Sequence, residues 1–198
     1  AAEAYMEGFW SADDLTTVMR ILALNQKAFE DMEKGLARLT APLYKFYHYV
    51  RKNTKTGSRK NILAHYDLGN DFYALFLDQT MTYSCGIFEK QDSTLKEASE
   101  AKYDRICRKL QLDPGDRIVE IGTGWGGFAV HAARNYGVHV TTTTISDEQH
   151  QFAQNRIKAA GLADRITLFK KDYRDLSGKF DKLVSIEMIE AVGHHFYD

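Results

Sequence analysis

The sequence predicts an α/β protein built on a doubly wound, mainly parallel sheet, with a helical segment in front of it. Two observations lead to this prediction. From residue 117 onward, short apolar stretches of strand length alternate with amphipathic stretches of helix length, which is the order typical of a parallel sheet. In the first 40 residues, by contrast, apolar side chains recur at helical spacing.

The first part of the chain, residues 1–60, is predicted to be a helical domain that ends in a linker. Residues 11–39 carry apolar side chains at spacings of three and four, enough for two helices, and Ser11 followed by Asp14 is a capping-box signal at their start. The stretch "RKNTKTGSRK", residues 51–60, has five basic residues and no acid. This composition is typical of a solvated linker, and contact with anionic lipid headgroups is the alternative interpretation.

The second part, residues 61–198, is predicted to carry the sheet. An amphipathic helix that ends near Leu110 and a turn at "DPGD" come before it. The expected strands are 117–121, 138–143, 165–169 and 180–186, and the expected helices between them are 126–136 and 147–160. A parallel sheet that stopped after the fourth strand would expose an apolar edge, so we expect the sheet to continue in a longer protein.

Composition and charge exclude several classes of function. Of the 198 residues, 44% are hydrophobic and 27% charged, which is typical of a globular protein, and a net charge of -1 gives no field that would attract nucleic acid. No apolar run has the length of a membrane span, and the N-terminus lacks the basic start of a signal peptide. Cys85 and Cys107 show no metal-type spacing, and so few cysteines indicate a reducing cytoplasm.

The stretch "VEIGTGWGGFAV", residues 119–130, reads as a strand, a glycine-rich turn and the start of a helix. Gly122, Gly124 and Gly127 fit the G-x-G-x-x-G pattern of dinucleotide sites. A dinucleotide site also needs an acid at the end of the next strand, and that strand reads "HVTTTTIS". Glu120, directly before the glycines, would repel a pyrophosphate and would suit a positively charged ligand such as S-adenosylmethionine. A turn whose glycines serve only packing is the alternative.

Five motifs in this order and at these spacings give the chain a family resemblance: "HYDLGNDFYALFLDQTMTYSCGIFE", "IVEIGTGWGG", "TTTISDEQ", "DYRDL" and "FDKLVSIEMIEAVGH". Together they resemble the cyclopropane-fatty-acyl-phospholipid synthase family, which includes the mycolic acid cyclopropane synthases. The resemblance covers residues 61–198, and "EAYMEGFWSADDL" is similar to the N-terminal helical domain of the bacterial phospholipid enzymes. It implies a Rossmann-like methyltransferase sheet that binds S-adenosylmethionine.

The resemblance also implies which residues bind the cofactor. Its amino-acid end would lie at Glu120, Gly122 and Gly124, and its adenine end at Asp172 and Tyr173. The stretch that binds the ribose would be Thr144, Ile145, Ser146 and Gln149, and the lid over the cofactor Tyr66, Tyr83 and Ser84. The family commonly has Cys where this chain has Thr123.

The implied reaction transfers a methylene group to a cis double bond of a phospholipid acyl chain, forming a cyclopropane ring. Methyl transfer leaves a carbocation that aromatic faces can stabilise, and a bound bicarbonate then removes a proton. By resemblance, bicarbonate is held by Cys85, largely through its backbone, and by Glu190. The family's other two holders, a His and a Tyr, lie beyond Asp198, so we expect these 198 residues alone to be inactive.

Other interpretations of these residues stay open. Glu187, Glu190 and His194 lie at helical spacing and could form a solvated face, and no second motif completes a metal site, so we expect no metal. Glu187, His194 and His195 are expected to be structural, and Cys85 taken alone would be an ordinary buried thiol.

Other functions also stay open. They are a methyltransferase that makes methyl-branched lipids, an N-methyltransferase of small amines, a non-catalytic module that binds cofactor or lipid, and an NAD oxidoreductase. The partners expected by resemblance are phospholipid acyl chains at the membrane surface, with pairing into a homodimer through the helical domain as a further expectation. The corresponding location is cytoplasmic, peripheral at the inner membrane surface.

Overall fold

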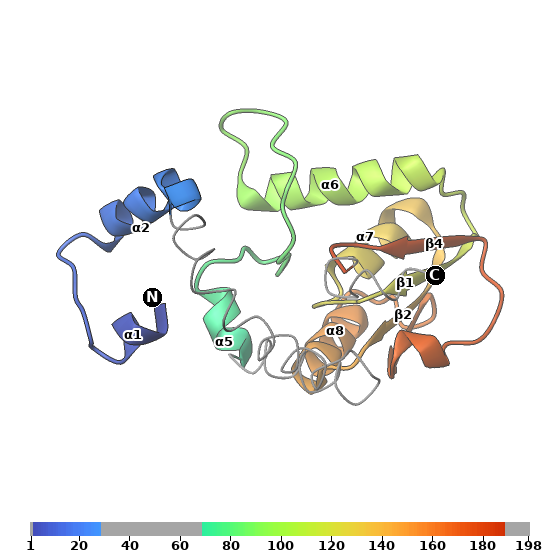
Figure 1. Cartoon of the computed structure of the whole chain (residues 1–198). Helices are drawn as coiled ribbons and strands as arrows, with labels where there is room; N and C mark the ends of the chain where they lie inside the picture. Colours follow the sequence, from blue (N-terminus) through green and yellow to red (C-terminus); the bar gives the residue numbers. More distant parts are fainter. Residues whose placement is uncertain (1, 29–68, 189–198) are drawn as a thin grey trace. The chain divides into compact units, whose positions relative to one another are not determined.

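The computed structural model describes residues 2–28 and 69–188, and the chain divides into two compact units, 1–52 and 53–198 (Figure 1). The predicted second helix of the first unit, the predicted linker 51–60, Tyr66, Glu190, His194 and His195 lie outside the described residues. No helix within the described ranges is long and apolar enough to cross a membrane.

The described part of the first unit is helical, as the sequence predicts. It contains α1 (Ala2–Met6) and α2 (Leu15–Leu24). The prediction of a capping box that begins at Ser11 is wrong, because Asp14 is itself the N-cap. Its carboxylate accepts hydrogen bonds from the backbone nitrogen of Thr17 at 3.0 Å and from the Thr17 hydroxyl at 2.6 Å. Asp14 is favoured because its short carboxylate reaches the unpaired amides of the first turn.

The second unit contains a sheet of four parallel strands in the order β3-β2-β1-β4. The strands are β1 (Arg117–Ile121), β2 (His139–Thr144), β3 (Ile166–Lys170) and β4 (Lys182–Ser185). The central strand β1 pairs with β2 on one side and β4 on the other. The predicted α/β class and the parallel, Rossmann-like sheet are therefore confirmed. The limits of β1 are as predicted, and those of the other three strands differ by one or two residues.

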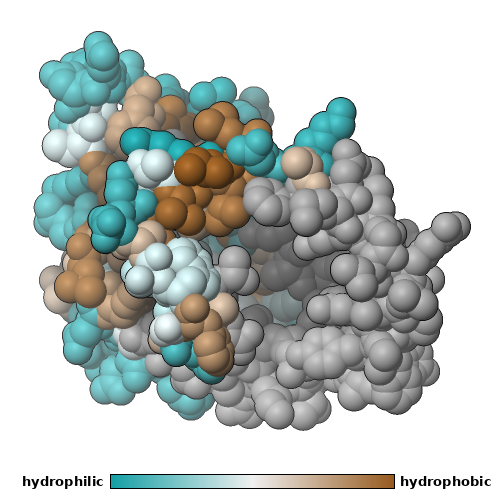
Figure 2. Space-filling view, turned by 60° about the vertical axis from the view of Figure 1, so that its left-hand side comes forward, coloured by the Kyte–Doolittle hydropathy of each residue, from teal (hydrophilic) through white to brown (hydrophobic). Residues whose placement is uncertain are grey.

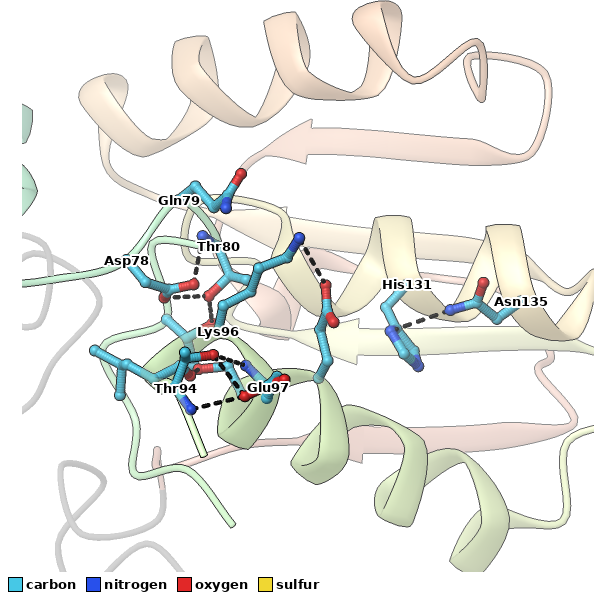
Figure 3. Close-up of polar contacts among 12 residues, drawn as sticks. Asp78, Gln79, Thr80, Thr94, Lys96, Glu97, His131 and Asn135 are labelled. Atoms are coloured by element: carbon cyan, nitrogen blue, oxygen red, sulfur yellow. Dashed lines mark hydrogen bonds and ion pairs between the residues drawn. The ribbon is translucent and has the colours of Figure 1, made fainter. Parts of the chain in front are cut away.

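The helices of the second unit are α5 (Gly69–Ala74), α6 (Leu95–Leu110), α7 (Gly127–Tyr136) and α8 (Asp147–Ala159), with a short 3₁₀ helix η1 (Tyr173–Asp175) after β3. The α6 helix begins at a capping box, in which Thr94 and Glu97 each bond the other's backbone nitrogen (Figure 3). The sequence interpretation located the end of α6 but neither this start nor α5. The helix α7 follows directly from the glycine turn, and its N-cap, Gly126, has a left-handed φ of 81°.

The core lies between one face of the sheet and α6, α7 and α8. Ile118, Val140 and Val184 point to this face and join a buried cluster with Tyr103 and Phe128. On the opposite face, Leu183 is 58% exposed and Phe169 is 37% exposed. Strand residues alternate between two faces, so the even-numbered side chains of β1, including Glu120, lie on the helix-covered side.

Candidate cofactor site at the carboxyl ends of the strands

The glycine turn after β1 has a backbone that only glycine adopts without strain. Gly122, Gly124 and Gly126 have φ values of 89°, 52° and 81°. A Cβ added at Gly122 or Gly124 would meet no heavy atom within 4 Å, so open space lies over the turn. Gly127 differs, because an added Cβ would overlap Tyr103 Oη. The first two glycines therefore leave room for a ligand against the backbone, while Gly127 is required by packing.

Glu120 comes directly before this turn, and its carboxylate is buried. The side chain is 2% exposed, and Oε2 accepts a hydrogen bond from Thr142 Oγ1 at 2.6 Å. Burial raises the pKa of Glu120 from 4.5 to about 7, and the bond from Thr142 partly offsets the rise. The Thr123 hydroxyl also lowers this pKa, although its Oγ1 makes no hydrogen bond of ordinary geometry within the described residues. A positive charge over the turn would favour the ionised form of Glu120.

The end of β2 and the start of α8 place three predicted ribose residues together. Thr144, Ser146 and Gln149 are all buried, and Ile145 is half-buried. The Thr144 hydroxyl donates to Gln149 Oε1 at 3.0 Å, and the Ser146 hydroxyl caps α8 by accepting from the Gln149 backbone nitrogen at 3.3 Å. These bonds fix the Gln149 side chain beside the strand end, in the place where a dinucleotide site has its acid.

The first carboxylates after β2 lie on the first turn of α8 and have other partners. Asp147 forms an ion pair with Lys170, and Glu148 accepts a hydrogen bond from Asn70 at 3.2 Å. The sequence argument against a dinucleotide therefore holds in the structure, because β2 itself ends in Thr144.

Thr143 joins the ends of three neighbouring strands. Its carbonyl oxygen accepts from the backbone nitrogens of Gly122 and Thr123 at 3.2 and 3.0 Å, and its hydroxyl donates to the carbonyls of Phe169 and Lys171. The predicted residues after β1, β2 and β3 consequently lie along one edge of the sheet, where open α/β sheets bind ligands.

Asp172 and Tyr173 lie at this edge, at the start of η1. The Asp172 carboxylate accepts from Arg174 Nε at 2.8 Å and from Nη2 at 2.6 Å, and also from the Arg174 backbone nitrogen at 2.9 Å. The Arg174 guanidinium thus bonds both carboxylate oxygens of Asp172. The predicted role of Asp172 at the adenine end stays a prediction.

Arg156 of α8 holds the segment before Tyr83, residues 79–80, beside the glycine turn by hydrogen bonds. The guanidinium donates to the carbonyls of Gln79 at 2.6 Å, Thr80 at 2.7 Å and Trp125 at 3.0 Å. Asp78 holds the Thr80 hydroxyl at 2.6 Å in the same segment (Figure 3). Three backbone acceptors for one side chain tie residues 79–80 to the turn.

Tyr83, Ser84 and Cys85, the predicted lid and anion residues, follow this segment. Tyr83 is 50% exposed, and its ring lies 5.4 Å from the ring of the buried Tyr73. The Ser84 hydroxyl accepts a hydrogen bond from Lys102 Nζ of α6. The alternative interpretation of Cys85 as an ordinary buried thiol is wrong, because that residue is exposed, whereas Cys107 is buried. The Cys85 backbone nitrogen donates to Glu187 Oε1 at 3.1 Å, just beyond the end of β4.

The sequence interpretation missed Lys102, Glu187 and Arg156. Glu187 was expected to be structural, and in the structure its carboxylate accepts from the Cys85 amide and its φ of 49° is left-handed. A signal for Lys102 was available, since it lies on the apolar stripe of α6 that contains Ala98 and Ile106. No local pattern indicates the three carbonyl partners of Arg156, which come from distant segments.

Within the described ranges, no cluster of three or more His, Cys, Asp or Glu side chains could hold a metal ion.

Comparison with known proteins identifies relatives of the whole second unit. The family model described as mycolic acid cyclopropane synthetase matches residues 53–198. A probable fatty acid methyltransferase of Pseudomonas putida is 47% identical over 146 residues, which cover 73% of this chain and 37% of that protein.

The cyclopropane-fatty-acyl-phospholipid synthase of Escherichia coli K12 is 40% identical over 202 residues, covering 99% of this chain and 49% of that protein. The chain thus spans between a third and a half of the length of these curated relatives.

A solved structure has a similar fold. The crystal structure of the mycolic acid cyclopropane synthase CmaA1 complexed with SAH and CTAB matches with a TM-score of 0.66 and 37% identity, covering 69% of this chain and 48% of that one. The fold, the five ordered motifs and these matches agree: the chain belongs to the mycolic acid cyclopropane synthetase family.

Proposed function

We propose that the protein binds S-adenosylmethionine at the glycine turn and transfers a one-carbon group from it to a lipid acyl chain. The observation that carries the proposal is the open turn at Gly122 and Gly124, with the carboxyl group of Glu120 directly before it and no acid at the end of β2. This arrangement suits a cofactor with positive charge and no phosphate. The related CmaA1 structure was solved with SAH, which supports the same choice.

The residues present fit such a cofactor. The left-handed glycines allow close approach to the backbone, and the Glu120 carboxyl would respond to an ammonium or sulfonium charge by losing its proton. Gln149, fixed by Thr144, offers a neutral amide for sugar hydroxyls. When bound, the cofactor supplies an activated methyl group.

The acceptor in this proposal is a cis double bond of a phospholipid acyl chain, and the product is a cyclopropane ring. The name of the Escherichia coli relative supports this acceptor. An alkene is a weak nucleophile, so the chain must hold it in line and exclude water. Tyr83, which is 50% exposed and packs against the ring of the buried Tyr73, offers an aromatic face that would stabilise a developing cation without reacting with it. Tyr66 is part of the same proposal as a lid residue.

The proposed base is bicarbonate, held by the Cys85 amide and by Glu190. In the structure the Cys85 amide already donates to Glu187. An anion could therefore take this amide only when the Glu187 carboxylate moves aside. We expect activity of the complete gene product to depend on added bicarbonate, and loss of that dependence in a fully active enzyme would refute this role.

Contact with a lipid surface is the remaining part of the proposal. Figure 2 shows apolar side chains, in brown, at the surface between hydrophilic ones. The exposed large apolar residues of α5 and the turn after it are Phe72, Leu75 and Phe76. The rings of Phe72 and Phe76 pack edge to face at 5.5 Å. We propose peripheral attachment at the cytoplasmic membrane surface, with a homodimer formed through the helical domain.

A second candidate is a methyltransferase that makes methyl-branched lipids, and the probable fatty acid methyltransferase of Pseudomonas putida favours it. In both reactions the carbocation left by methyl transfer must lose a proton. Loss from the new methyl group closes the cyclopropane ring, whereas loss from a neighbouring carbon leaves a branched alkene, which becomes a saturated methyl branch only when a separate reductant supplies hydride.

The experiment that tests the proposal gives methyl-labelled S-adenosylmethionine and vesicles with cis-unsaturated phospholipids to the complete gene product. Mass spectrometry of the lipids should show a gain of one CH₂ on the acyl chain. NMR then separates a cyclopropane from a methyl branch. Label in a soluble amine and none in lipid would refute the lipid acceptor and leave the cofactor assignment intact. Lipid chains that stay unlabelled, with no other labelled product, would refute transfer altogether.

A further inference from the structure

The Lys102 ammonium is buried between the segment that carries Ser84 and Cys85 and the end of β4. The side chain is 6% exposed, although it lies on a helix with ample solvent on its other faces. Its Nζ donates to the Ser84 hydroxyl, a neutral acceptor. No carboxylate within the described residues forms an ion pair with it. An ammonium in this position costs stability that methionine would not, so packing alone does not explain lysine here.

The electrostatics of Lys102 agree with this position. Burial lowers the pKa of Lys102, and its electrostatic interactions with Glu187 and Cys85 partly offset the lowering. Lys102 and Glu187 thus attract each other across the Cys85 backbone, whose amide donates to the Glu187 carboxylate at 3.1 Å. The cation on α6 and the anion beyond β4 hold the segment from both sides.

The same segment is docked on α6 at a fixed register. A Cβ added to Gly86 would lie 2.7 Å from Ala98 Cβ, and the Ile87 backbone nitrogen donates to the Ala98 carbonyl at 2.9 Å. Ala98 and Lys102 are one helical turn apart, so the Lys102–Ser84 bond continues this contact in the direction of the candidate site.

Strained backbone marks both ends of the arrangement. Met81 has φ 52° and Glu187 has φ 49°, and both are side-chain-bearing residues in the left-handed region. This conformation is strained for residues that carry a side chain, and it persists where the surrounding structure holds it in place.

We propose that Lys102 is a positioning residue, which holds the Ser84–Cys85 segment at the carboxyl end of β4 in the geometry needed for one-carbon transfer. This inference rests on the proposed function, and in it Lys102 acts through the Ser84–Cys85 segment. Misplacement of a catalytic segment by about 1 Å can reduce a rate about a hundredfold. The role of Lys102 is therefore visible in the rate of the reaction rather than in binding.

The first test uses hydrogen exchange and does not depend on activity. We compare the chain with its variants Lys102→Met and Lys96→Met. Lys96 is the matched control, since it lies on the same helix, is 45% exposed and pairs with Glu100. We expect the Cys85 and Ile87 amides to exchange at least about tenfold faster in Lys102→Met and unchanged in Lys96→Met. Equal exchange in all three proteins would overturn the proposal.

The second test measures kinetics of the complete gene product. We expect Lys102→Met to lower kcat by about tenfold to a hundredfold while KM for S-adenosylmethionine stays within about twofold. An unchanged kcat, or a rise in KM alone, would overturn the positioning role. A wild-type gene product with no lipid transfer would refute the proposed function instead, and the exchange result would still decide whether Lys102 holds the segment.

A variant that removes the acceptor covers the case in which Lys102→Met does not fold. Ser84→Ala leaves the ammonium in place and deletes its hydrogen-bond partner in the described structure. We expect faster exchange at Cys85 and Ile87 in this variant as well. Exchange identical to the wild type would overturn the proposal independently of Lys102→Met.

Discussion

Replacement of Glu120 by glutamine should remove part of the pH dependence of the unfolding free energy. Burial holds the pKa of Glu120 at about 7, compared with 4.5 for an unperturbed glutamate. Between these values the folded chain binds a proton that the unfolded chain releases. The stability due to this proton is fully present below pH 4.5 and is lost as the pH rises through 7. A difference of two to three pKa units corresponds to about 3 kcal/mol of unfolding free energy.

The glutamine variant has no such proton, and its amide oxygen can still accept the Thr142 hydroxyl. We therefore expect Glu120→Gln to gain about 3 kcal/mol relative to the wild type between pH 5 and pH 8. Urea unfolding of both proteins at the two pH values measures this double difference, and groups common to both proteins cancel. A Glu120→Gln variant whose stability relative to wild type is the same at both pH values would refute a buried, neutral Glu120.

Three further predictions follow from the packing around the site. Burial lowers the pKa of His131, so the stability that its neutral form contributes should be lost as the pH falls below 6.5. In His131→Gln the unfolding free energy, measured with urea, should therefore change less between pH 7.5 and pH 5.5 than in the wild type. Parallel pH profiles of the two proteins would contradict this. Gly127→Ala should lower the unfolding free energy, measured by thermal unfolding, by about 1–3 kcal/mol, because the new Cβ meets Tyr103 Oη. Adding Tyr103→Phe should recover part of this loss. An alanine variant as stable as the wild type would disprove the contact. Arg156→Met should lower the unfolding free energy by about 3 kcal/mol, because three hydrogen bonds to carbonyl oxygens are lost. It should also speed amide exchange at residues 79–82. Exchange at the wild-type rate would contradict the role of Arg156 in holding this segment.

The sheet could be predicted from the sequence because its signals are local. The strands β1, β3 and β4 contain short apolar stretches, β2 consists mainly of β-branched residues, and the glycines after β1 mark a backbone that other residues avoid. The strand limits differ from the prediction at Val138, which is buried in the core but comes before β2 begins. Burial and strand pairing are separate properties, and apolar pattern reports only the first.

The candidate site could be predicted only in part, because its contacts join distant segments. The positions of Gly122, Gly124 and Gln149 follow from the turn and the strand ends. The bond between Cys85 and Glu187 connects residues 102 apart, and no spacing rule reaches across that distance. Family resemblance directed attention to Glu190, which lies outside the described residues, while the structure shows Glu187 on the Cys85 amide.

The central claim is that the glycine turn binds S-adenosylmethionine, and a calorimetric titration of the chain and two alanine variants tests it most directly. Gly122 and Gly161 have φ values of 89° and 69°, and neither would meet an atom within 4 Å through an added Cβ. The two substitutions therefore carry similar backbone strain, but only Gly122 lies in the turn. We predict that the wild type and Gly161→Ala bind the cofactor alike, that Gly122→Ala binds at least about tenfold more weakly, and that NAD does not bind. Equal affinity of both variants, or binding of NAD in place of S-adenosylmethionine, would contradict the account.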